Sequence, residues 1–311
     1  MSVASGANAV RIRAPGKLVL SGAYSVLWGA PAIVAAVSRG AIADTSRPAV
    51  HVADEVRAAI DLGMIEHGCY VNVSELRAPT EDGGSRKLGL GSSAAIVVAT
   101  LAAMTFDASE PEDAQRARLF TLAMRAHKHV QPDGSGVDVA ASTFGGVLDA
   151  RIEEGALRLA PRALPARVRV VAARRPASTK DMVAQVRAFA DARPGAFARI
   201  LERASSGAEA ARDARDEEAF IAALRIQDGA LRELARESGA PIFTAEFDEL
   251  ARRAERDGAF FGPSGAGGGD VGIHVGSSTE AFATGLGELG VDAIDLTVGA
   301  PGVERMERWV I

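Results

Sequence analysis

Two glycine-rich segments contain the residue types that suit phosphate binding. The first, GLGSSAA at Gly89–Ala95, leads directly into an apolar stretch that predicts a helix. The first N–H groups of a helix lack partners within the helix and carry partial positive charge, and glycine lets the backbone approach an anion closely. The hydroxyls of Ser92 and Ser93 can reach a phosphate oxygen or Mg²⁺, and Lys87 adds a cation just before the loop. These residues predict a phosphate site.

Three interpretations of this loop compete. The first is a tight turn capped by serine. The second is a dinucleotide fold, since Gly89-x-Gly91-x-x-Ala94 matches the GxGxxA fingerprint and Asp107 lies at a suitable distance. We reject it because a polar loop precedes the glycines and a helix over 92–106 leaves no room for a second strand. The third is a nucleoside triphosphate site, which is not of the Walker type because the chain has no GxxxxGK[ST]. The loop alone does not decide between the first and the third.

The second glycine-rich segment is PSGAGGGD at residues 263–270, in which glycine occupies Gly265, Gly267, Gly268 and Gly269. So much backbone freedom carries a considerable entropy cost on folding. A plain surface turn rarely needs it, whereas a loop pressed against a ligand does. The segment therefore predicts a second ligand-binding loop.

Two charged residues stand beside glycines. Lys17 follows Ala14-Pro15-Gly16, which predicts a turn that leads into an apolar strand, and Asp138 lies between Gly136 and a run of small residues. Taken singly, the lysine is typical of an exposed surface residue and the aspartate of a capping or turn residue. Their chemistry depends on what the fold brings next to them.

The elements expected to position these residues follow from the hydrophobic pattern. In the first half we expect a strand at 8–13, paired short strands within 17–37, a polar loop at 78–87, a buried helix at 92–106, a helix from about Pro111 to Val130, and a loop followed by small residues at 131–146.

In the second half we expect a strand at 167–174, three or four helices within 180–257 with breaks near Pro194, Gly207 and Gly239, a glycine loop leading into a strand at 260–276, and a final strand pair at 291–298 and 303–311. This order predicts an α+β fold rather than a regularly alternating parallel sheet. We expect two domains, 1–163 and 164–311.

Whole-chain composition excludes several classes of function. Lys and Arg number 35 and Asp and Glu 40, for a net charge of −5 without a basic tract, so nucleic acid is not an expected partner. The single cysteine, Cys69, excludes an intramolecular disulfide. The start of the chain has no apolar core of signal-peptide length and no run long enough to span a bilayer. We expect a cytoplasmic protein with a small-molecule substrate and no membrane partner, as a monomer or homodimer.

Three motifs in order resemble the GHMP kinase superfamily, named for galactokinase, homoserine kinase, mevalonate kinase and phosphomevalonate kinase. APGK at 14–17 is similar to its first motif, KLGLGSSAA at 87–95 to its second, and SGAGGGD at 264–270 to its third. The resemblance implies an N-terminal α+β domain and a C-terminal ferredoxin-like domain with the active site between them.

Within the superfamily, the phosphomevalonate kinases are the most similar. GAYSVLWGAPAIVAAVSRG at 22–40, Lys87 ahead of the loop, GSGVDVAAS at 134–142 and PASTKDMV at 176–183 all look like segments of that family. Three positions depart from its pattern: Ala23 replaces a frequent Glu, Gly262 a common Lys, and Val271 the usual Cys.

The resemblance implies roles for individual residues. Lys17 and Asp138 are the implied catalytic pair, and Ser93 is the implied Mg²⁺ ligand. The implied ATP-binding residues are Lys87, Gly89, Leu90, Gly91, Ser92, Ser93 and Ala94. The implied acceptor-binding residues are Tyr24, Ser135, Gly136, Ser178, Lys180, Ser264, Gly265, Ala266, Gly267 and Gly268.

The activity that this resemblance implies is ATP-dependent phosphorylation of 5-phosphomevalonate to 5-diphosphomevalonate, in the mevalonate route to isoprenoids. Two alternatives stay open: phosphorylation of mevalonate or another small alcohol, and a non-catalytic ligand sensor with the same fold. Decarboxylation of a mevalonate phosphate fits less well, because the PAST-like segment and K-x-GLGSS argue against it. The role of Asp138 depends on the acceptor, since a hydroxyl benefits from a base and a phosphate does not.

Overall fold

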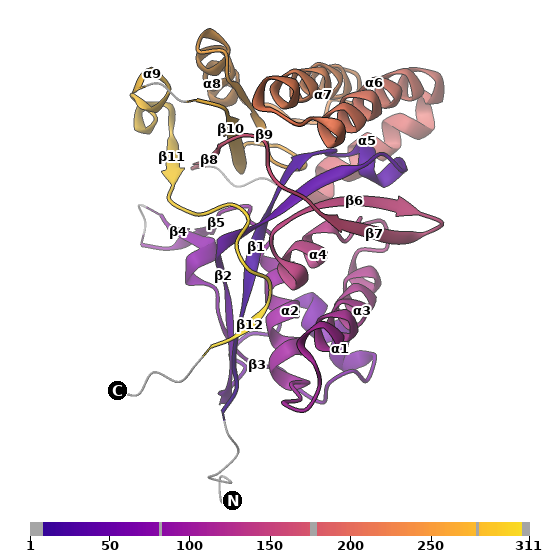
Figure 1. Cartoon of the computed structure of the whole chain (residues 1–311), viewed down its shortest axis with the longest axis vertical. Coiled ribbons are helices and arrows are strands. Elements are labelled where there is room, and N and C mark those ends of the chain that lie inside the picture. Colours follow the sequence, from indigo (N-terminus) through magenta and orange to yellow (C-terminus); the bar gives the residue numbers. More distant parts are fainter. Residues whose placement is uncertain (1–8, 81–82, 175–178, 278–279, 307–311) are drawn as a thin grey trace, which may run out of the picture.

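A computed structural model describes residues 9–80, 83–174, 179–277 and 280–306 (Figure 1). Two sheets lie one above the other along the long axis of the molecule. The first sheet has the strand order β12-β1-β2-β6-β7, with β3 also paired to β2, and the second has the order β11-β8-β10-β9. The predicted α+β class is confirmed.

The first sheet is built mainly from the N-terminal half. Its strands are β1 (Arg11–Ser21), β2 (Ala32–Pro48), β3 (Cys69–Asn72), β6 (Val147–Glu153), β7 (Ala156–Pro161) and β12 (Glu304–Arg305). β1 and β2 are antiparallel, so the predicted strand pair within 17–37 is confirmed, and the short helix η1 (Ser25–Trp28) connects them.

The turn predicted at Ala14-Pro15-Gly16 is wrong. β1 runs straight through these residues and adjusts its register between Pro15 and Gly16, where a bulge accommodates the proline. A Cβ placed on Gly16 would lie 2.6 Å from the carbonyl oxygen of Leu90. Gly16 therefore permits a close approach between β1 and the segment Gly89–Ala95, which is called the first glycine loop from here on. Lys17 lies within a strand rather than at a turn.

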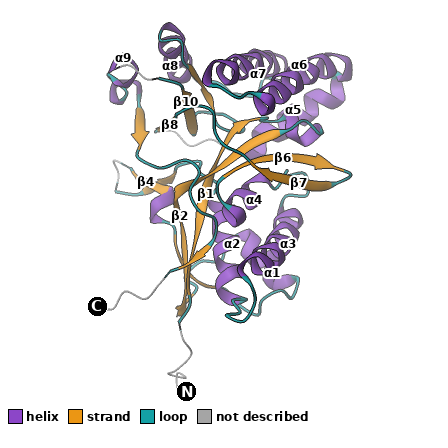
Figure 2. Ribbon diagram, viewed as in Figure 1, coloured by secondary structure: helices purple, strands orange, loops and turns teal. Residues whose placement is uncertain are grey.

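Four helices lie on one side of this sheet: α1 (Asp54–Asp61), α2 (Ser92–Met104), α3 (Glu112–Val130) and α4 (Val137–Phe144) (Figure 2). Helices α2 and α4 pack on its strands, and α1 and α3 pack against α2. The buried helix predicted at 92–106 is α2, and the helix predicted to begin near Pro111 is α3, whose N-cap is Pro111. Both predictions are confirmed.

One loop prediction in this half is incomplete and another is wrong. Within residues 131–146, the run of small residues that follows the loop forms the eight-residue helix α4, which the sequence did not predict. Residues 78–87 contain most of a hairpin made by β4 (Arg77–Pro79) and β5 (Ser85–Lys87), which follows the short helix η2 (Ser74–Leu76). The hairpin leads directly into the first glycine loop.

The second sheet has four antiparallel strands, β8 (Val168–Ala173), β9 (Phe260–Pro263), β10 (Val271–Val275) and β11 (Val291–Ile294). The predicted strand at 167–174 is β8. The second glycine-rich segment, which contains the third motif SGAGGGD, joins β9 to β10 and thus turns between two paired strands. It is called the third glycine loop from here on.

Four helices, α5 (Thr179–Ala192), α6 (Pro194–Asp213), α7 (Glu217–Ser238) and α8 (Ala245–Arg256), fill the predicted helical region and lie along the upper part of Figure 1. The shorter α9 (Glu280–Ala283) and η3 (Gly287–Leu289) precede β11. The break predicted at Gly207 is wrong, because Gly207 lies inside α6, where a Cβ would lie 2.7 Å from Cγ of Gln227. Gly207 thus serves helix packing.

The predicted final strand pair is also wrong. β11 pairs with β8 in the second sheet, whereas β12 returns to pair with β1 in the first. Residues 307–311 lie outside the described residues. The predicted division between residues 163 and 164 falls between β7 and β8 and stays a prediction.

Gln227 of α7 joins the helical layer to the end of β1. Its side-chain oxygen accepts hydrogen bonds from the backbone N–H of Gly22 at 2.7 Å and from the hydroxyl of Ser21 at 3.1 Å. One hydrophobic core includes Leu18 of β1 and Ile273 of β10, so both sheets share it. Among the described residues, no helix is long and apolar enough to cross a bilayer.

Candidate active site

A pocket of about 450 Å³ brings together elements that are far apart in the sequence. Its walls come from β1, the turn after β1, the segment from the end of α3 to the start of α4, helix α5 and the third glycine loop. Lys17, Asp138 and Gly265 all line it, so both implied catalytic residues and the third motif share one pocket.

Lys17 connects the two glycine loops. Its backbone N–H donates to the carbonyl of Leu90 at 2.8 Å, and its side chain passes so close to Gly91 that a Cβ there would lie 2.7 Å from Cγ of the lysine. Nζ of Lys17 lies 4.0 Å from the position of a Cβ on Gly265. Burial lowers the pKa of Lys17, and the nearby carboxylates of Asp138 and Asp270 oppose that shift. A cation held in this way can stabilise negative charge at the junction of the loops.

Asp138 is held at the first turn of α4. Gly136, the N-cap residue, has φ 77°, and a Cβ there would lie 2.4 Å from Cε of Met124. Oδ1 of Asp138 accepts a hydrogen bond from the N–H of Val139 at 2.9 Å. The tight fit at Gly136 fixes the start of the helix and, with it, the position of the carboxylate near Lys17.

The first glycine loop has the geometry expected for an anion site. Gly89 and Gly91 have φ values of 73° and 74°, and Gly91 is the N-cap of α2. The side chains of Leu90 and Ala94 are buried in the core, so these two residues present only backbone to the loop. Ser92 and Ser93 are partly exposed on the first helical turn. Lys87 is exposed on β5, just before the loop.

The third glycine loop touches the first. A Cβ on Gly89 would lie 2.8 Å from Cβ of Asp270, the last residue of SGAGGGD. The hydroxyl of Ser264 accepts from the N–H of Val19 at 3.0 Å and donates to its carbonyl at 3.1 Å. The donor and one acceptor position of this hydroxyl therefore go to β1, which fixes the loop beside the pocket.

The other end of the third loop is held against the segment before α8. The N–H of Gly268 donates to the carbonyl of Ile242 at 2.9 Å. A Cβ on Gly267 would lie 2.4 Å from the same oxygen, and Gly267 has φ 85°. Only glycine fits this position without moving backbone.

Tyr24 also supports this loop. Its hydroxyl donates to the carbonyl of Ala266 at 2.6 Å, and burial raises the pKa of this tyrosine. The backbone of Tyr24 has φ 60° and ψ −54°, and the N–H of Ser25 donates to the carbonyl of Ala23 at 2.7 Å. That is a γ-turn of the rare, strained positive-φ kind. Tyr24 lines the pocket, and its hydroxyl is already committed to the loop.

The other residues predicted to bind the acceptor have different placements. Ser135 lines the pocket, and Gly136 is the N-cap of the neighbouring helix α4. Ser178 lies outside the described residues. Lys180 belongs to α5, and its side chain lies outside what the structure describes.

Sequence reasoning missed three residues of this region, His127, Arg187 and Asp270. The first two line the pocket, and the third lies close enough to raise the pKa of Lys17. His127 and Arg187 occupy helices that contain many charged side chains, so no local signal separates them from their neighbours. Asp270 is the last residue of the third motif, and this position could have identified it from the sequence.

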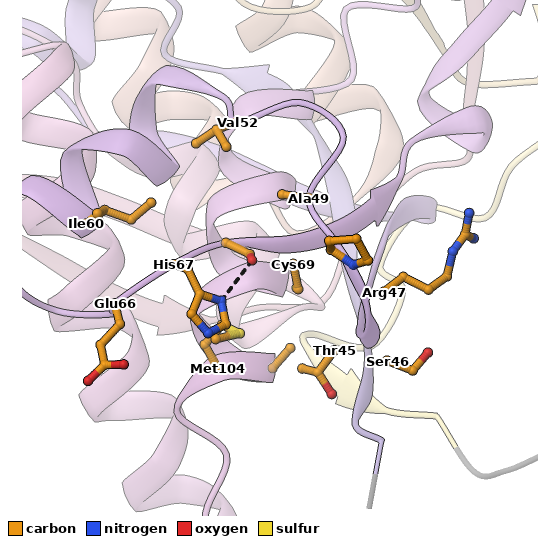
Figure 3. Close-up of a pocket in the computed structure, with 13 residues that line it drawn as sticks. Thr45, Ser46, Arg47, Ala49, Val52, Ile60, Glu66, His67, Cys69 and Met104 are labelled. Atoms are coloured by element: carbon orange, nitrogen blue, oxygen red, sulfur yellow. Dashed lines mark hydrogen bonds between the residues drawn. The ribbon is translucent and has the colours of Figure 1, made fainter. Parts of the chain in front are cut away.

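A second pocket, of about 610 Å³, lies away from these residues (Figure 3). Its lining includes Thr45 and Arg47 of β2, His67, and Met104 at the C-terminal end of α2. The glycine loop is at the N-terminal end of the same thirteen-residue helix, about 20 Å away at 1.5 Å per residue. This pocket contains none of the motif residues and is not part of the candidate active site.

Comparisons with known proteins agree with the motifs. Residues 50–146 match the family described as GHMP kinases N terminal domain. A phosphomevalonate kinase of Streptomyces sp. strain CL190 is 31% identical, with 87% of this chain and 91% of the relative covered. A mevalonate kinase of Archaeoglobus fulgidus is 26% identical, with 82% and 88% covered.

A solved structure has the same fold. Streptococcus pneumoniae phosphomevalonate kinase, in complex with phosphomevalonate and AMPPNP, superposes with a TM-score of 0.72, covering 96% of this chain and all of its own length. At 16% identity this likeness bears on the fold alone. The two-domain architecture that the motifs implied is confirmed.

Proposed function

This chain belongs to the GHMP kinase family, and from that premise we propose that it transfers the γ-phosphoryl group of ATP to 5-phosphomevalonate. The observation that carries the proposal is the position of Lys17. It touches the first glycine loop at Gly91, lies beside Gly265 of the third, and has Asp138 nearby in a pocket of suitable size. The 31% identity to a Streptomyces phosphomevalonate kinase supports this acceptor.

Phosphoryl transfer depends mostly on positioning and on stabilising charge. The backbone N–H groups at the start of α2, with the hydroxyls of Ser92 and Ser93, would hold the phosphates of ATP. Lys17 would neutralise charge that develops on the transferred group. The third loop would close the acceptor side, because Ser264 fixes it to β1 and Tyr24 to the wall of the pocket.

Mg²⁺ fits this arrangement with few protein ligands. The described residues contain no group of three or more His, Cys, Asp or Glu side chains able to hold a metal ion. Mg²⁺ commonly keeps several waters and binds through one or two protein groups together with substrate phosphates. The partly exposed Ser93 would be such a ligand, and the ion would neutralise phosphate charge.

Mevalonate is the second candidate acceptor, and the specific observation in its favour is the mevalonate kinase of Archaeoglobus fulgidus at 26% identity. The two acceptors require different chemical roles of Asp138. A phosphomonoester has a second pKa of about 6, so it is mostly dianionic at pH 7 and needs no base. A hydroxyl acceptor gains from a carboxylate that removes its proton.

The proposal is tested by measuring ADP release with ATP and either mevalonate or 5-phosphomevalonate. We expect turnover of 5-phosphomevalonate, with a kcat/KM at least tenfold above that for mevalonate. The reverse order would assign the protein as a mevalonate kinase. Consumption of neither acceptor, with retained ATP binding, would favour a ligand sensor and overturn the proposal.

Asp138→Asn separates the two chemistries. With 5-phosphomevalonate we expect a loss of less than about tenfold in kcat, because the carboxylate then only positions Lys17 or a substrate hydroxyl. With a hydroxyl acceptor the loss should approach the 10²–10⁴-fold typical of general-base catalysis. An equal loss with both acceptors would contradict this division of roles.

A further inference from the structure

Two polar side chains of the pocket have unmet hydrogen-bonding capacity. His127 is only 2% exposed, and neither of its ring nitrogens has a hydrogen-bond partner among the described residues. Nε of Arg187 is likewise buried without a partner in the described part of the chain. Buried polar groups in folded proteins are nearly always hydrogen-bonded, so such groups beside a cavity point to a ligand.

His127 and Arg187 reach the pocket from different helices. His127 lies near the end of α3, and Arg187 lies in the middle of α5. The loop between α3 and α4 crosses over the histidine, since a Cβ on Gly134 would lie 2.6 Å from its Nε2. Glycine at this position lets the loop pack directly on the imidazole, and it keeps the ring at the pocket wall.

The guanidinium of Arg187 makes only long contacts within the protein, among them one at 5.8 Å from the centroid of the Trp28 ring. Its terminal nitrogen lies 3.4 Å from a carboxylate oxygen of Asp133 and 3.4 Å from the carbonyl of the same residue. Asp133 is 67% exposed and Arg187 is 37% exposed. Exposed pairs of this length contribute roughly 0–1 kcal/mol. A ligand anion could therefore replace Asp133 at little cost.

The pocket thus has two cations in its lining, Lys17 and Arg187. Lys17 is near Asp138, and Arg187 is beside Asp133, so each cation is close to a different end of the segment 133–138. Apolar side chains complete the lining, among them Val26, Leu27, Val130 and Val183. Such a lining suits a short hydrocarbon skeleton with one anionic group at Lys17 and a second at Arg187.

We propose that Arg187 and His127 form a carboxylate subsite for the end of the acceptor that is not phosphorylated. The inference rests on the proposed function, and it deepens that function because mevalonate and 5-phosphomevalonate both carry a carboxylate opposite the reacting end. The planar guanidinium can donate two parallel hydrogen bonds to a carboxylate, and a ring N–H of His127 can donate a third. When a carboxylate occupies this subsite, the pocket fixes the distance along the acceptor between its carboxylate and the transferred phosphoryl group.

The test compares Arg187→Met with Arg193→Met. Arg193 lies just beyond α5, is exposed and pairs with Glu237 outside the pocket, so it is a matched control. We expect Arg187→Met to raise the KM for the acceptor about 10- to 100-fold, as the loss of a charge-assisted pair implies, and to leave the KM for ATP within about twofold. Arg193→Met should change neither. Arg187→Lys should recover only part of the loss, because lysine lacks the planar fork.

A second acceptor identifies the group that is bound. In an analogue of 5-phosphomevalonate with the carboxylate replaced by a methyl group, wild type and Arg187→Met should show the same KM. If Arg187→Met weakens the binding of both acceptors equally, or of neither, the assignment is overturned. His127→Phe should lower affinity for the carboxylate-bearing acceptor only. An equal effect on the analogue would assign His127 to packing and remove it from the subsite.

Binding measurements keep the subsite and the catalytic proposal apart. Titration calorimetry of mevalonate and 5-phosphomevalonate requires no turnover. If neither is phosphorylated but Arg187→Met still weakens binding of both, the catalytic proposal fails and the subsite stands. If 5-phosphomevalonate is turned over equally well by wild type and Arg187→Met, the catalytic proposal stands and the subsite is refuted.

Discussion

The first and third glycine loops are both rich in glycine, but for different structural reasons. Gly89 and Gly91 turn the chain into α2, so the N-terminal end of that helix faces the loop's own backbone. The third loop instead joins two antiparallel strands, and its shape depends on Val19, Tyr24 and Ile242. The first loop is therefore shaped by its own sequence and the helix that follows it, whereas the third is held in place by distant parts of the chain.

Lys17 is where the two loops meet, and this makes the comparison testable. Its aliphatic chain passes against Gly91 of the first loop, and its ammonium approaches Gly265 of the third. A change in the first loop should therefore act mainly on catalysis, through Lys17. A change in the third should act mainly on stability and on acceptor binding.

The largest effect is expected from Gly91→Ala. The added Cβ would lie 2.7 Å from Cγ of Lys17, and that flexible side chain can yield only by moving its ammonium. Misplacement of a catalytic group by about 1 Å can cost on the order of 100-fold in rate, so we expect at least about a 100-fold loss of kcat. Steady-state kinetics with saturating ATP and acceptor measures it.

Gly63→Ala is the control for Gly91→Ala. Gly63 also has positive φ, 68°, but no atom lies within 4 Å of its Cβ position. Both variants should lose roughly 1–2 kcal/mol of stability from the left-handed backbone. Only Gly91→Ala should lose activity in the folded protein, and an equal loss of kcat in both would contradict the role given to Lys17.

A smaller effect, on stability, is expected from Gly267→Ala in the third loop. Its Cβ would lie 2.4 Å from the carbonyl oxygen of Ile242, and backbone cannot yield as a side chain does. We expect a loss of roughly 2 kcal/mol in the free energy of unfolding, measured by urea denaturation. The KM for the acceptor should rise more than the KM for ATP. A rise confined to ATP would break the assignment of this loop to the acceptor side.

The same contrast explains what could be predicted from the sequence. The first loop and α2 were predictable, because glycines, serines and an apolar run lie together between Gly89 and Met104. The course of β1 was not, because Pro15 and Gly16 indicate a turn unless Leu90 is known to lie against them. α4 was missed because it has only eight residues, fewer than the window over which a helical pattern can be recognised. Arg187 was not predictable, since only the tertiary structure separates it from the other arginines of the helices.

Tyr24→Phe tests whether the hydrogen bond from Tyr24 holds the third loop in place. Removing the hydroxyl leaves the carbonyl of Ala266 without this donor, and the loss of one such bond costs about 1 kcal/mol. We expect a rise of a few-fold in the KM for the acceptor with little change in kcat. The matched control is Tyr70→Phe, the other tyrosine of the chain, which lies in β3 beneath the guanidinium of Arg47 and outside the pocket. If both variants have the same KM as wild type, Tyr24 is not a support of the loop.

The smallest effect is expected from Asp270→Asn, and its sign follows from the charges around Lys17. The protonated lysine is the form that can stabilise phosphate charge. Burial lowers its pKa, while Asp138 and Asp270 raise it. Removing one carboxylate lowers the pKa further, so the alkaline decline of kcat/KM should begin at a lower pH than in wild type. Profiles between pH 7 and pH 11 measure this, with Asp61→Asn on the exposed face of α1 as control. An alkaline decline that stays in place, or moves to higher pH, would mean that the third loop does not contribute to the charge at Lys17, and its part in the site would then be steric alone.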